Sequence, residues 1–514
     1  MIRLHWLGLG ALALAAIAAC ATSSDGAAAL PAPTDESPSG LPDAQAPNDA
    51  FEGGTDALPP QKSLERCSPD GWCITDLPDD DLDLRDVRPF QDRAFAVAES
   101  QTLGIQFLEW ERSTDAWKFI NEGTQNQLDR GNYAGNMWAP NENEVYFTLA
   151  PAFVYHGKRP DPGSPFTWKI SRLDTPDGAS IADDAGAPAD DGGLPDAAAG
   201  RPAHDPGRVW GLDKALHPPV SADAFAPSLG VQGMPWGDVY AWYGPTLFRR
   251  TVAESGDDVW VVEHRLLDDE YPDDEFHIQS ITGGAPDDFW IGGVRSLVGA
   301  DGMRERACPL VVQRRADGYH HLVDHVVDAV TASFTTGCNP KPGSQRLVAR
   351  WDIPDLFALD FEEEATGWLQ SLQHIAPNTV VGIKVGNGGQ GLVYVKSDGD
   401  TPLARLNIVD YSGPIWSLNF SSVWVADGSA WMSGHGFVLS LEYNPTDWSR
   451  GVGISSVSSP AQTLCSVMQC ATFTPSSIAR GGVVHEERLH QLRGISSTNL
   501  WAVGNRHALH KTTP

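Results

Sequence analysis

Short apolar runs bounded by polar turn residues recur along this chain. One such run, Leu500–Gly504, follows the turn cluster Ser497–Asn499 and precedes a second turn and another apolar run. Turn residues on both sides of short β-branched and aromatic runs are typical of β-hairpins. The pattern therefore predicts a chain of short strands and gives no indication of long helices.

The same pattern occurs seven times. The apolar runs are centred near Phe95, Tyr146, Tyr240, Trp290, Val381, Trp431 and Trp501. After most of them, at variable distance, comes a polar residue followed by an aromatic one, which we interpret as an outer strand; in the sixth unit this pattern falls at Asp447 and Trp448. Repeats of this kind predict the four-stranded blades of a seven-bladed β-propeller, an all-β fold.

The seventh unit is one strand short. Its third strand, around Ala508, is followed only by a few residues, whereas an unmatched outer-strand pattern, Ser68–Trp72, precedes the first unit. We expect Asp70–Ile74 to pair with the Ala508 strand and close the ring, which removes free sheet edges. A β-sandwich or a parallel β-helix also contains short strands, but a sandwich predicts neither repeats nor a matching fragment at the opposite terminus.

The Trp-Ala-Val-Gly strand resembles the WAVG-type propeller repeats of secreted bacterial proteins. More distantly, the units are similar to the propellers of photosystem-assembly factors and to sialidase-like BNR repeats. The resemblance covers about residues 65–514. Because its motifs are short, it implies a fold and no particular activity.

The N-terminal residues resemble a bacterial lipoprotein signal. Arg3 supplies a positive charge, Trp6–Ala19 is a short apolar run, and Ile17–Cys20 is similar to a lipobox. The run is too short for a spanning helix. The resemblance implies a signal peptide at residues 1–19, acylation of Cys20, for example by palmitate, and stable anchoring in the outer membrane or at the cell surface. An ordinary secretory signal is the alternative.

Two tracts fall outside the repeats. Residues 20–62 are rich in Ala, Asp, Pro, Ser and Gly and predict a disordered tether before the propeller, and the acidic tract 174–206 predicts a disordered insertion. The formal net charge of −31 argues against nucleic-acid binding, which needs basic surfaces.

The cysteines fit an exported protein. Seven are present, and setting Cys20 aside leaves six. An oxidising compartment permits three local disulfides. The expected pairs are Cys67 with Cys73, Cys308 with Cys338, and Cys465 with Cys470. None of them has the CxxC spacing that a zinc site favours.

No catalytic constellation stands out. The histidines of His485–His490 are five residues apart, where a zinc-protease helix needs four. The cluster His320, His321, Asp324 and His325 would be divided between two faces of a strand. We therefore expect no catalytic residue, metal or cofactor. A paired-carboxylate glycosidase stays open, because two acids distant in sequence can meet in a propeller funnel.

One face of the propeller is expected to bind a partner. Loops between blades and turns between second and third strands share that face, and the long insertions 174–206, 293–308, 320–367 and 450–486 all belong to it; we call it the insertion-bearing face. Its second-to-third-strand turns contribute the candidate binding residues Gln101, Tyr243, Arg295, Asn387, His435, Arg506 and His507. The leading hypothesis is a monomeric, non-catalytic propeller that binds a protein or glycan. The alternative is a surface glycoside hydrolase or lyase of the sialidase-like type.

Overall fold

The computed structural model divides the chain into residues 1–59 and 60–514, and the described residues all belong to the second unit. The described ranges are 66–126, 133–150, 152–174, 228–270, 274–298, 304–328, 344–350, 367–385, 391–398, 403–408, 420–426, 428–442, 452–454, 471–478 and 487–513. The predicted signal peptide, the tether 20–62 and residues 175–206 of the predicted insertion lie outside them.

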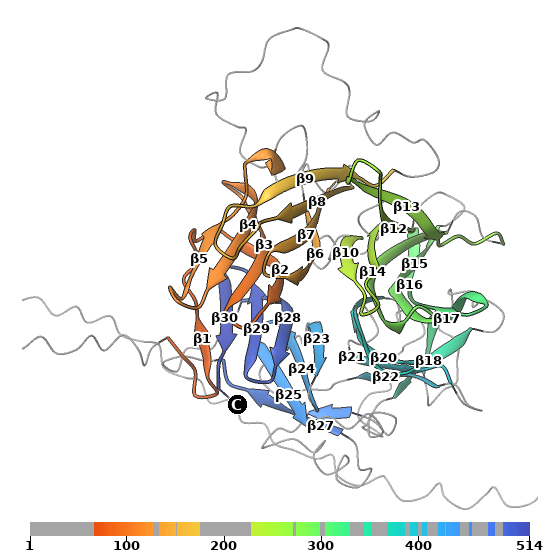
Figure 1. The fold of residues 1–514 in the computed structure, drawn as a ribbon. Helices are drawn as coiled ribbons and strands as arrows, with labels where there is room; N and C mark the ends of the chain where they lie inside the picture. Colours follow the sequence, from red (N-terminus) through yellow and green to blue (C-terminus); the bar gives the residue numbers. More distant parts are fainter. Residues whose placement is uncertain are drawn as a thin grey trace, which may run out of the picture. The chain divides into compact units, whose positions relative to one another are not determined.

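The second unit is an all-β, seven-bladed propeller, as predicted (Figure 1). Blade 1 comprises β2 (Asp83–Pro89), β3 (Arg93–Ser100), β4 (Gly104–Glu111) and β5 (Ala116–Phe119). Blade 2 comprises β6 (Ala134–Asn141), β7 (Glu144–Leu149), β8 (Phe153–Lys158) and β9 (Thr167–Arg172). Blade 3 comprises β10 (Leu229–Gly233), β11 (Val239–Tyr243), β12 (Thr246–Val252) and β13 (Asp258–Arg265). Blade 4 comprises β14 (Glu275–Ala285), β15 (Asp288–Val298), β16 (Arg304–Arg315) and β17 (Gly318–Asp328).

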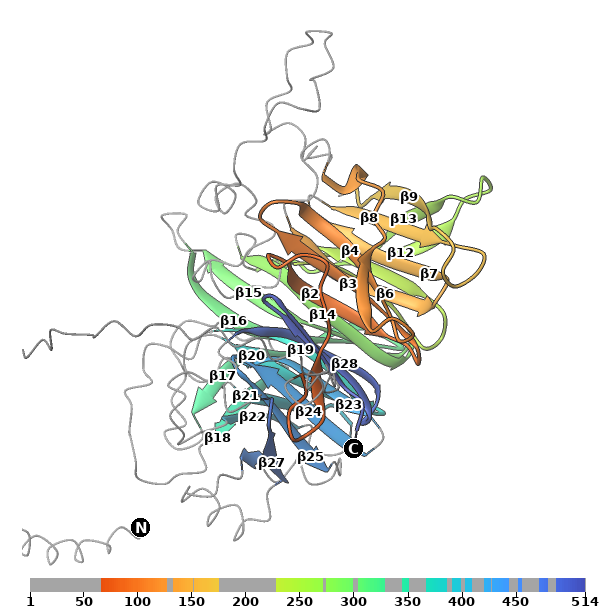
Figure 2. The same cartoon turned by 90° about the vertical axis from the view of Figure 1, so that its left-hand side faces the viewer.

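The remaining blades complete the ring. Blade 5 comprises β19 (Trp368–Ala376), β20 (Thr379–Val385), β21 (Gly391–Lys396) and β22 (Leu403–Ile408). Blade 6 comprises β23 (Phe420–Ala426), β24 (Ser429–Gly434), β25 (Phe437–Glu442) and β27 (Ala471–Ser476). Blade 7 comprises β28 (Leu489–Ser496), β29 (Asn499–Gly504), β30 (His507–Lys511) and β1 (Trp72–Ile74). The side view shows no helical layer over the blades (Figure 2), and the described residues include one short 3-10 helix, η2 (Thr124–Asn126).

Each second strand is apolar on both faces because it is sandwiched between neighbouring blades. Along β29 every residue is buried. Trp501 and Val503 pack against blade 1, whereas Leu500 and Ala502 pack against blade 6, as the two-residue period of a strand requires. Burial of one such side chain contributes about 1.5 to 3 kcal/mol. The repeated apolar runs of the sequence are therefore the layers between blades.

The N-terminal strand closes the ring as predicted. β1 pairs antiparallel with β30, and Ile74 lies opposite Leu509. The backbone N–H and the hydroxyl of Thr75 both donate to the carbonyl oxygen of Ala508, at 3.0 and 2.9 Å. The side chain of Trp72 is fully buried against blades 6 and 7. Residues from opposite ends of the chain thus form one blade.

One predicted disulfide, Cys67–Cys73, is present and joins β1 to the residues just before it. Cys308 is also disulfide-bonded. Its predicted partner, Cys338, lies outside the described residues, so that pairing stays a prediction. The same holds for Cys465 with Cys470 and for Cys20.

Three details differ from the expectation. The outer strand of blade 6 is β27 and does not come from Asp447 and Trp448, which lie outside the described residues. Blades 4 and 5 are joined at their outer edges by an additional strand, β18 (Gln345–Arg350), which runs parallel to β17 and β22. A short strand, β26 (Val452–Ile454), similarly runs parallel to β27. Parts of two predicted insertions therefore extend the sheets.

Candidate functional site

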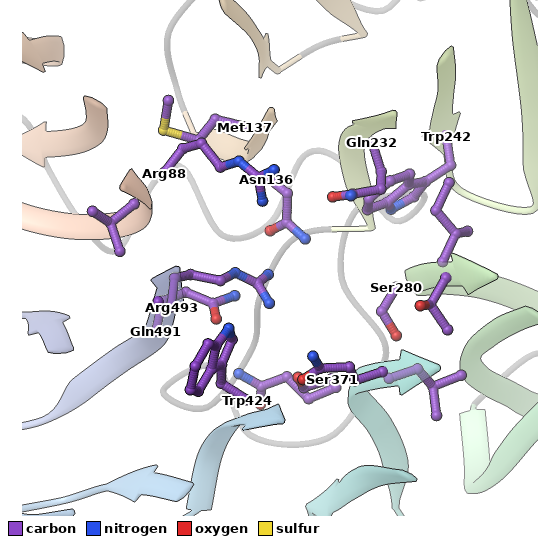
Figure 3. Close-up of a pocket in the computed structure, with 17 residues that line it drawn as sticks. Arg88, Asn136, Met137, Gln232, Trp242, Ser280, Ser371, Trp424, Gln491 and Arg493 are labelled. Carbon is purple, nitrogen blue, oxygen red and sulfur yellow. The ribbon is translucent and has the colours of Figure 1, made fainter. Parts of the chain in front are cut away.

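The inner strands of the blades surround a central channel with a cavity of about 160 Å³ (Figure 3). Most of the polar side chains that line it are neutral amides and hydroxyls. They include Asn136, Gln232, Ser280, Ser371, Gln373 and Gln491. Because these side chains donate and accept hydrogen bonds without carrying charge, this wall suits a polar ligand or ordered water.

Neighbouring blades hold several of these groups in place. Gln373 donates to the carbonyl oxygen of Val425 at 2.6 Å and accepts from its N–H at 2.7 Å. Ser422 donates to Gln491 at 2.8 Å. By contrast, the hydroxyl of Ser280 is buried without a hydrogen-bond partner among the described residues. The channel wall therefore combines fixed amides with a buried hydroxyl group that the described residues leave unpaired.

Two arginines bring positive charge to the channel. Arg88 comes from β2 and Arg493 from β28, and Figure 3 shows both guanidinium groups extending into the channel. Asp86, which is buried beside them, lies 3.6 Å from Nε of Arg493. No Asp or Glu is among the described side chains that line the cavity.

A second hollow, with a volume of about 900 Å³, lies where blades 1 and 7 meet. We call it the seam groove. It is lined by the connection from β1 to β2, together with Thr102 from the β3–β4 turn and Arg506 and His507 from the β29–β30 turn. Because second-to-third-strand turns and inter-blade connections share one face, the seam groove lies on the insertion-bearing face.

Hydrogen bonds and a salt bridge hold two acidic residues of the seam groove in place. The backbone N–H and hydroxyl of Thr102 donate to Asp81 at 3.0 and 2.8 Å. Although burial opposes the change, hydrogen bonds from Ser100 and Thr102 lower the pKa of Asp81. Asp76 forms a 2.6 Å salt bridge with Arg66. The groove is therefore lined by several carboxylates as well as by Arg506.

Arg506 and His507, two of the predicted binding residues, line the groove and are positioned by backbone contacts. Arg506 has a φ of 59°, its N–H donates to the carbonyl oxygen of Leu82 at 2.8 Å, and its side chain is exposed. Nδ1 of His507 lies 2.7 Å from the carbonyl oxygen of Asn505 and donates to it. The contact with Leu82 ties this turn to blade 1.

The structure separates the other predicted residues. Gln101 is exposed in the β3–β4 turn beside the groove, and His435 is exposed between β24 and β25. Tyr243 is buried in the core at the end of β11. Asn387 lies outside the described residues.

We expected Arg295 in an exposed turn. It lies instead within the long strand β15. It is 1% exposed and forms salt bridges with Asp268 at 3.1 Å and with Asp274 at 2.6 Å. β15 and β16 stay paired from Arg295 opposite Cys308 to Val298 opposite Arg304, with one register shift, so position 295 belongs to the paired strands. The two carboxylates neutralise this arginine. Arg295 is therefore a buried structural residue and does not present its side chain to a partner.

Sequence reasoning missed the channel residues because it considered turns alone. The available signal was the charge on β2, where four of the seven residues are Asp or Arg, since charged residues within an inner strand face the channel or pair with one another. Among the described residues, no group of three His, Cys, Asp or Glu side chains could hold a metal ion. Of the histidine pair His485 and His490 in the sequence analysis, His490 lies in β28, where its Nε2 is 2.8 Å from Oδ1 of Asp83.

Comparison with solved structures finds distant likenesses. Virginiamycin B lyase from Staphylococcus aureus is 9% identical and matches over 85% of this chain and 97% of that chain, with a TM-score of 0.44. YCF48 bound to D1 peptide is 11% identical over 88% and 100%, with a TM-score of 0.41, and Sqt1 from Saccharomyces cerevisiae is 7% identical over 86% and 98%, with a TM-score of 0.39. No family model matches the chain, and no curated protein does. Likenesses this distant assign neither activity nor partner.

Proposed function

We propose that this protein is a lipid-anchored, non-catalytic propeller of the bacterial cell envelope that binds a protein or glycan partner through its insertion-bearing face. Anchoring is supported by the apolar run that ends in Cys20 and by the Ala-, Asp- and Pro-rich residues that follow it. The Trp-Ala-Val-Gly repeats support membership of the WAVG-type propellers. The tether would hold a folded domain at a distance from the membrane surface.

The seam groove is the observation that carries the binding proposal. Its volume of about 900 Å³ is comparable to that of established ligand sites. Both acidic side chains and Arg506 line it, which gives a partner both signs of charge to match. Arg506 is the second residue of the two-residue turn between Gly504 and His507, and its φ of 59° is common at that turn position.

The hydrolase alternative lacks comparable support. Glycosidases of the common kind need two carboxylates flanking the bond that is cleaved. Asp86 lies beside Arg493, which lines the channel, and it already accepts the backbone N–H groups of Val87 at 2.9 Å and Met137 at 3.0 Å. The described residues that line the cavity include no carboxylate.

Affinity capture from intact cells tests the proposal with two matched variants. Arg506→Glu reverses a charge at the seam groove, whereas Arg112→Glu makes the same change in the β4–β5 turn on the opposite face, where Arg112 is exposed. The wild type and Arg112→Glu should capture the same partner, and Arg506→Glu should lose most of it. Equal capture by all three proteins would contradict binding at the seam groove.

A further inference from the structure

The central channel holds more positive than negative charge, although the chain as a whole carries a net charge of −31. Arg88 and Arg493 are the charged side chains among the described residues that line it. An acidic protein that concentrates positive charge in one narrow, partly enclosed cavity creates a local field that attracts anions. The channel therefore differs electrostatically from the rest of the molecule.

Arg88 lacks a compensating partner in the described part of the chain. No carboxylate there lies within salt-bridge distance of its guanidinium group, and its Nε is buried without a hydrogen-bond partner. Burial and the positive charge of Arg493 lower the pKa of Arg88, whereas Asp86 opposes this change. A guanidinium held in this way is destabilised unless an anion reaches it.

Asp86 can neutralise only part of this charge. It is 2% exposed, lies 3.6 Å from Nε of Arg493, and accepts backbone N–H groups from Val87 and Met137 on two neighbouring blades. These hydrogen bonds hold its carboxylate in place between blades 1 and 2. When Asp86 is ionised, two guanidinium groups face one carboxylate, and one positive charge is left over.

The remaining wall combines hydrogen-bond donors with apolar surface. The hydroxyl of Ser280 is buried without a partner among the described residues, and the amide of Asn136 lines the same cavity as Arg88 (Figure 3). Met137, Leu372 and Trp424 add apolar side chains to the same cavity. The cavity of about 160 Å³ is close in size to an engineered cavity that accommodates benzene.

We propose that this channel is a binding site for a small organic acid, whose single carboxylate lies between Arg88 and Arg493. One carboxylate balances the one surplus charge, and guanidinium groups bind carboxylates through paired N–H donors. The apolar wall accommodates a short carbon stem, which inorganic anions lack. The site is separate from the seam groove and needs no macromolecular partner.

Isothermal titration calorimetry on the full-length protein tests this site with sodium propionate as the probe. Propionamide, which is neutral and nearly isosteric, and sodium sulfate serve as comparison ligands at constant ionic strength. Propionate should bind to one site per chain, and propionamide should show no measurable binding. Equal heats from propionate and propionamide, or no propionate binding, would overturn the proposal, and binding of sulfate alone would overturn the carboxylate assignment.

Two methionine substitutions locate the bound anion. Arg88→Met should weaken propionate binding by about tenfold or more, because it removes hydrogen bonds to a charged group. Without ligand it should also unfold at a higher temperature than the wild type, since the uncompensated charge is gone. Arg112→Met, on the protein surface, should change neither. Unaltered propionate affinity in Arg88→Met would place the anion elsewhere and refute the site.

Arg88→Lys keeps the proposal testable if the methionine variant fails to fold. Lysine retains the positive charge but lacks the planar pair of donors, so propionate should bind more weakly than to the wild type and more tightly than propionamide. A lysine variant with wild-type affinity would show that charge alone attracts the anion and would overturn binding between two guanidinium groups.

Discussion

Truncation of Trp72 should open the propeller at one place. Its side chain is fully buried and donates from Nε1 to the hydroxyl of Ser476 at 3.0 Å. Its ring packs edge to face against Trp431, with the two ring centroids 6.2 Å apart. Replacing a buried tryptophan by alanine costs about 3 to 5 kcal/mol, and loss of the hydrogen bond adds about 1 kcal/mol. Since folded domains are stable by only about 5 to 15 kcal/mol, Trp72→Ala should remove a large part of the total.

Hydrogen exchange followed by mass spectrometry can locate the damage. We expect Trp72→Ala to accelerate exchange in β1 and β30, because the pairing between them depends on the packing of Trp72. Trp290→Ala is the matched control, since Trp290 is also fully buried and donates to Asp288 at 2.6 Å, but it lies within blade 4. This control should accelerate exchange in blades 4 and 5 and leave β30 protected.

The comparison of these two variants can refute the closure mechanism. If β30 stays protected in Trp72→Ala, the N-terminal strand does not hold the ring together. If both variants accelerate exchange at the same positions, the propeller opens as a whole and has no weaker seam. Either result would contradict the reasoning from the packing of Trp72.

Three further predictions concern the anchor, a disulfide and pH. Cys20→Ser should release the protein from the membrane fraction while the propeller still folds; a variant that stays membrane-bound after a high-salt wash would disprove lipid anchoring. Non-reducing peptide mapping should find Cys308 linked to Cys338, and any other partner for Cys308 would refute that pair. Burial lowers the pKa of His510 to about 4, so between pH 6.5 and 4 the unfolded chain binds a proton that the folded chain does not. The contribution of His510 to the free energy of unfolding should therefore fall by about 2 kcal/mol as pH drops from 6.5 to 4.5. Denaturant titrations should show a smaller fall in total stability for His510→Phe than for the wild type. Equal pH dependence in both proteins would contradict this.

The fold was predictable because the repeats carry their own signal. A strand buried on both faces must be apolar throughout, so the strand at Leu500–Gly504 and its counterparts stand out from the polar turns around them. The closure was predictable because a propeller needs whole blades and the missing strand had a match at Ser68–Trp72. Both inferences rest on local patterns that are visible in one sequence.

The channel was not predictable, since its charge depends on residues that the fold brings together from opposite ends of the chain. Arg88 and Arg493 have no sequence pattern in common. Arg295 was wrongly predicted to be an exposed binding residue in a turn. The hairpin continues past it, and two acidic residues from the connection between β13 and β14 neutralise it. Hairpin length and long-range ion pairs are set by tertiary packing, which a turn pattern does not report.

Site-specific photo-crosslinking in intact cells tests the central claim, which is that the insertion-bearing face binds a partner. A photoreactive residue in place of Gln101 would lie beside the seam groove, and one in place of Gln91, in the β2–β3 turn of the same blade, would lie on the opposite face; both native side chains are exposed. We predict a discrete cross-linked partner from position 101 and none from position 91. Cross-linking from position 91 alone, or equally from both positions, would contradict the assignment of the binding face.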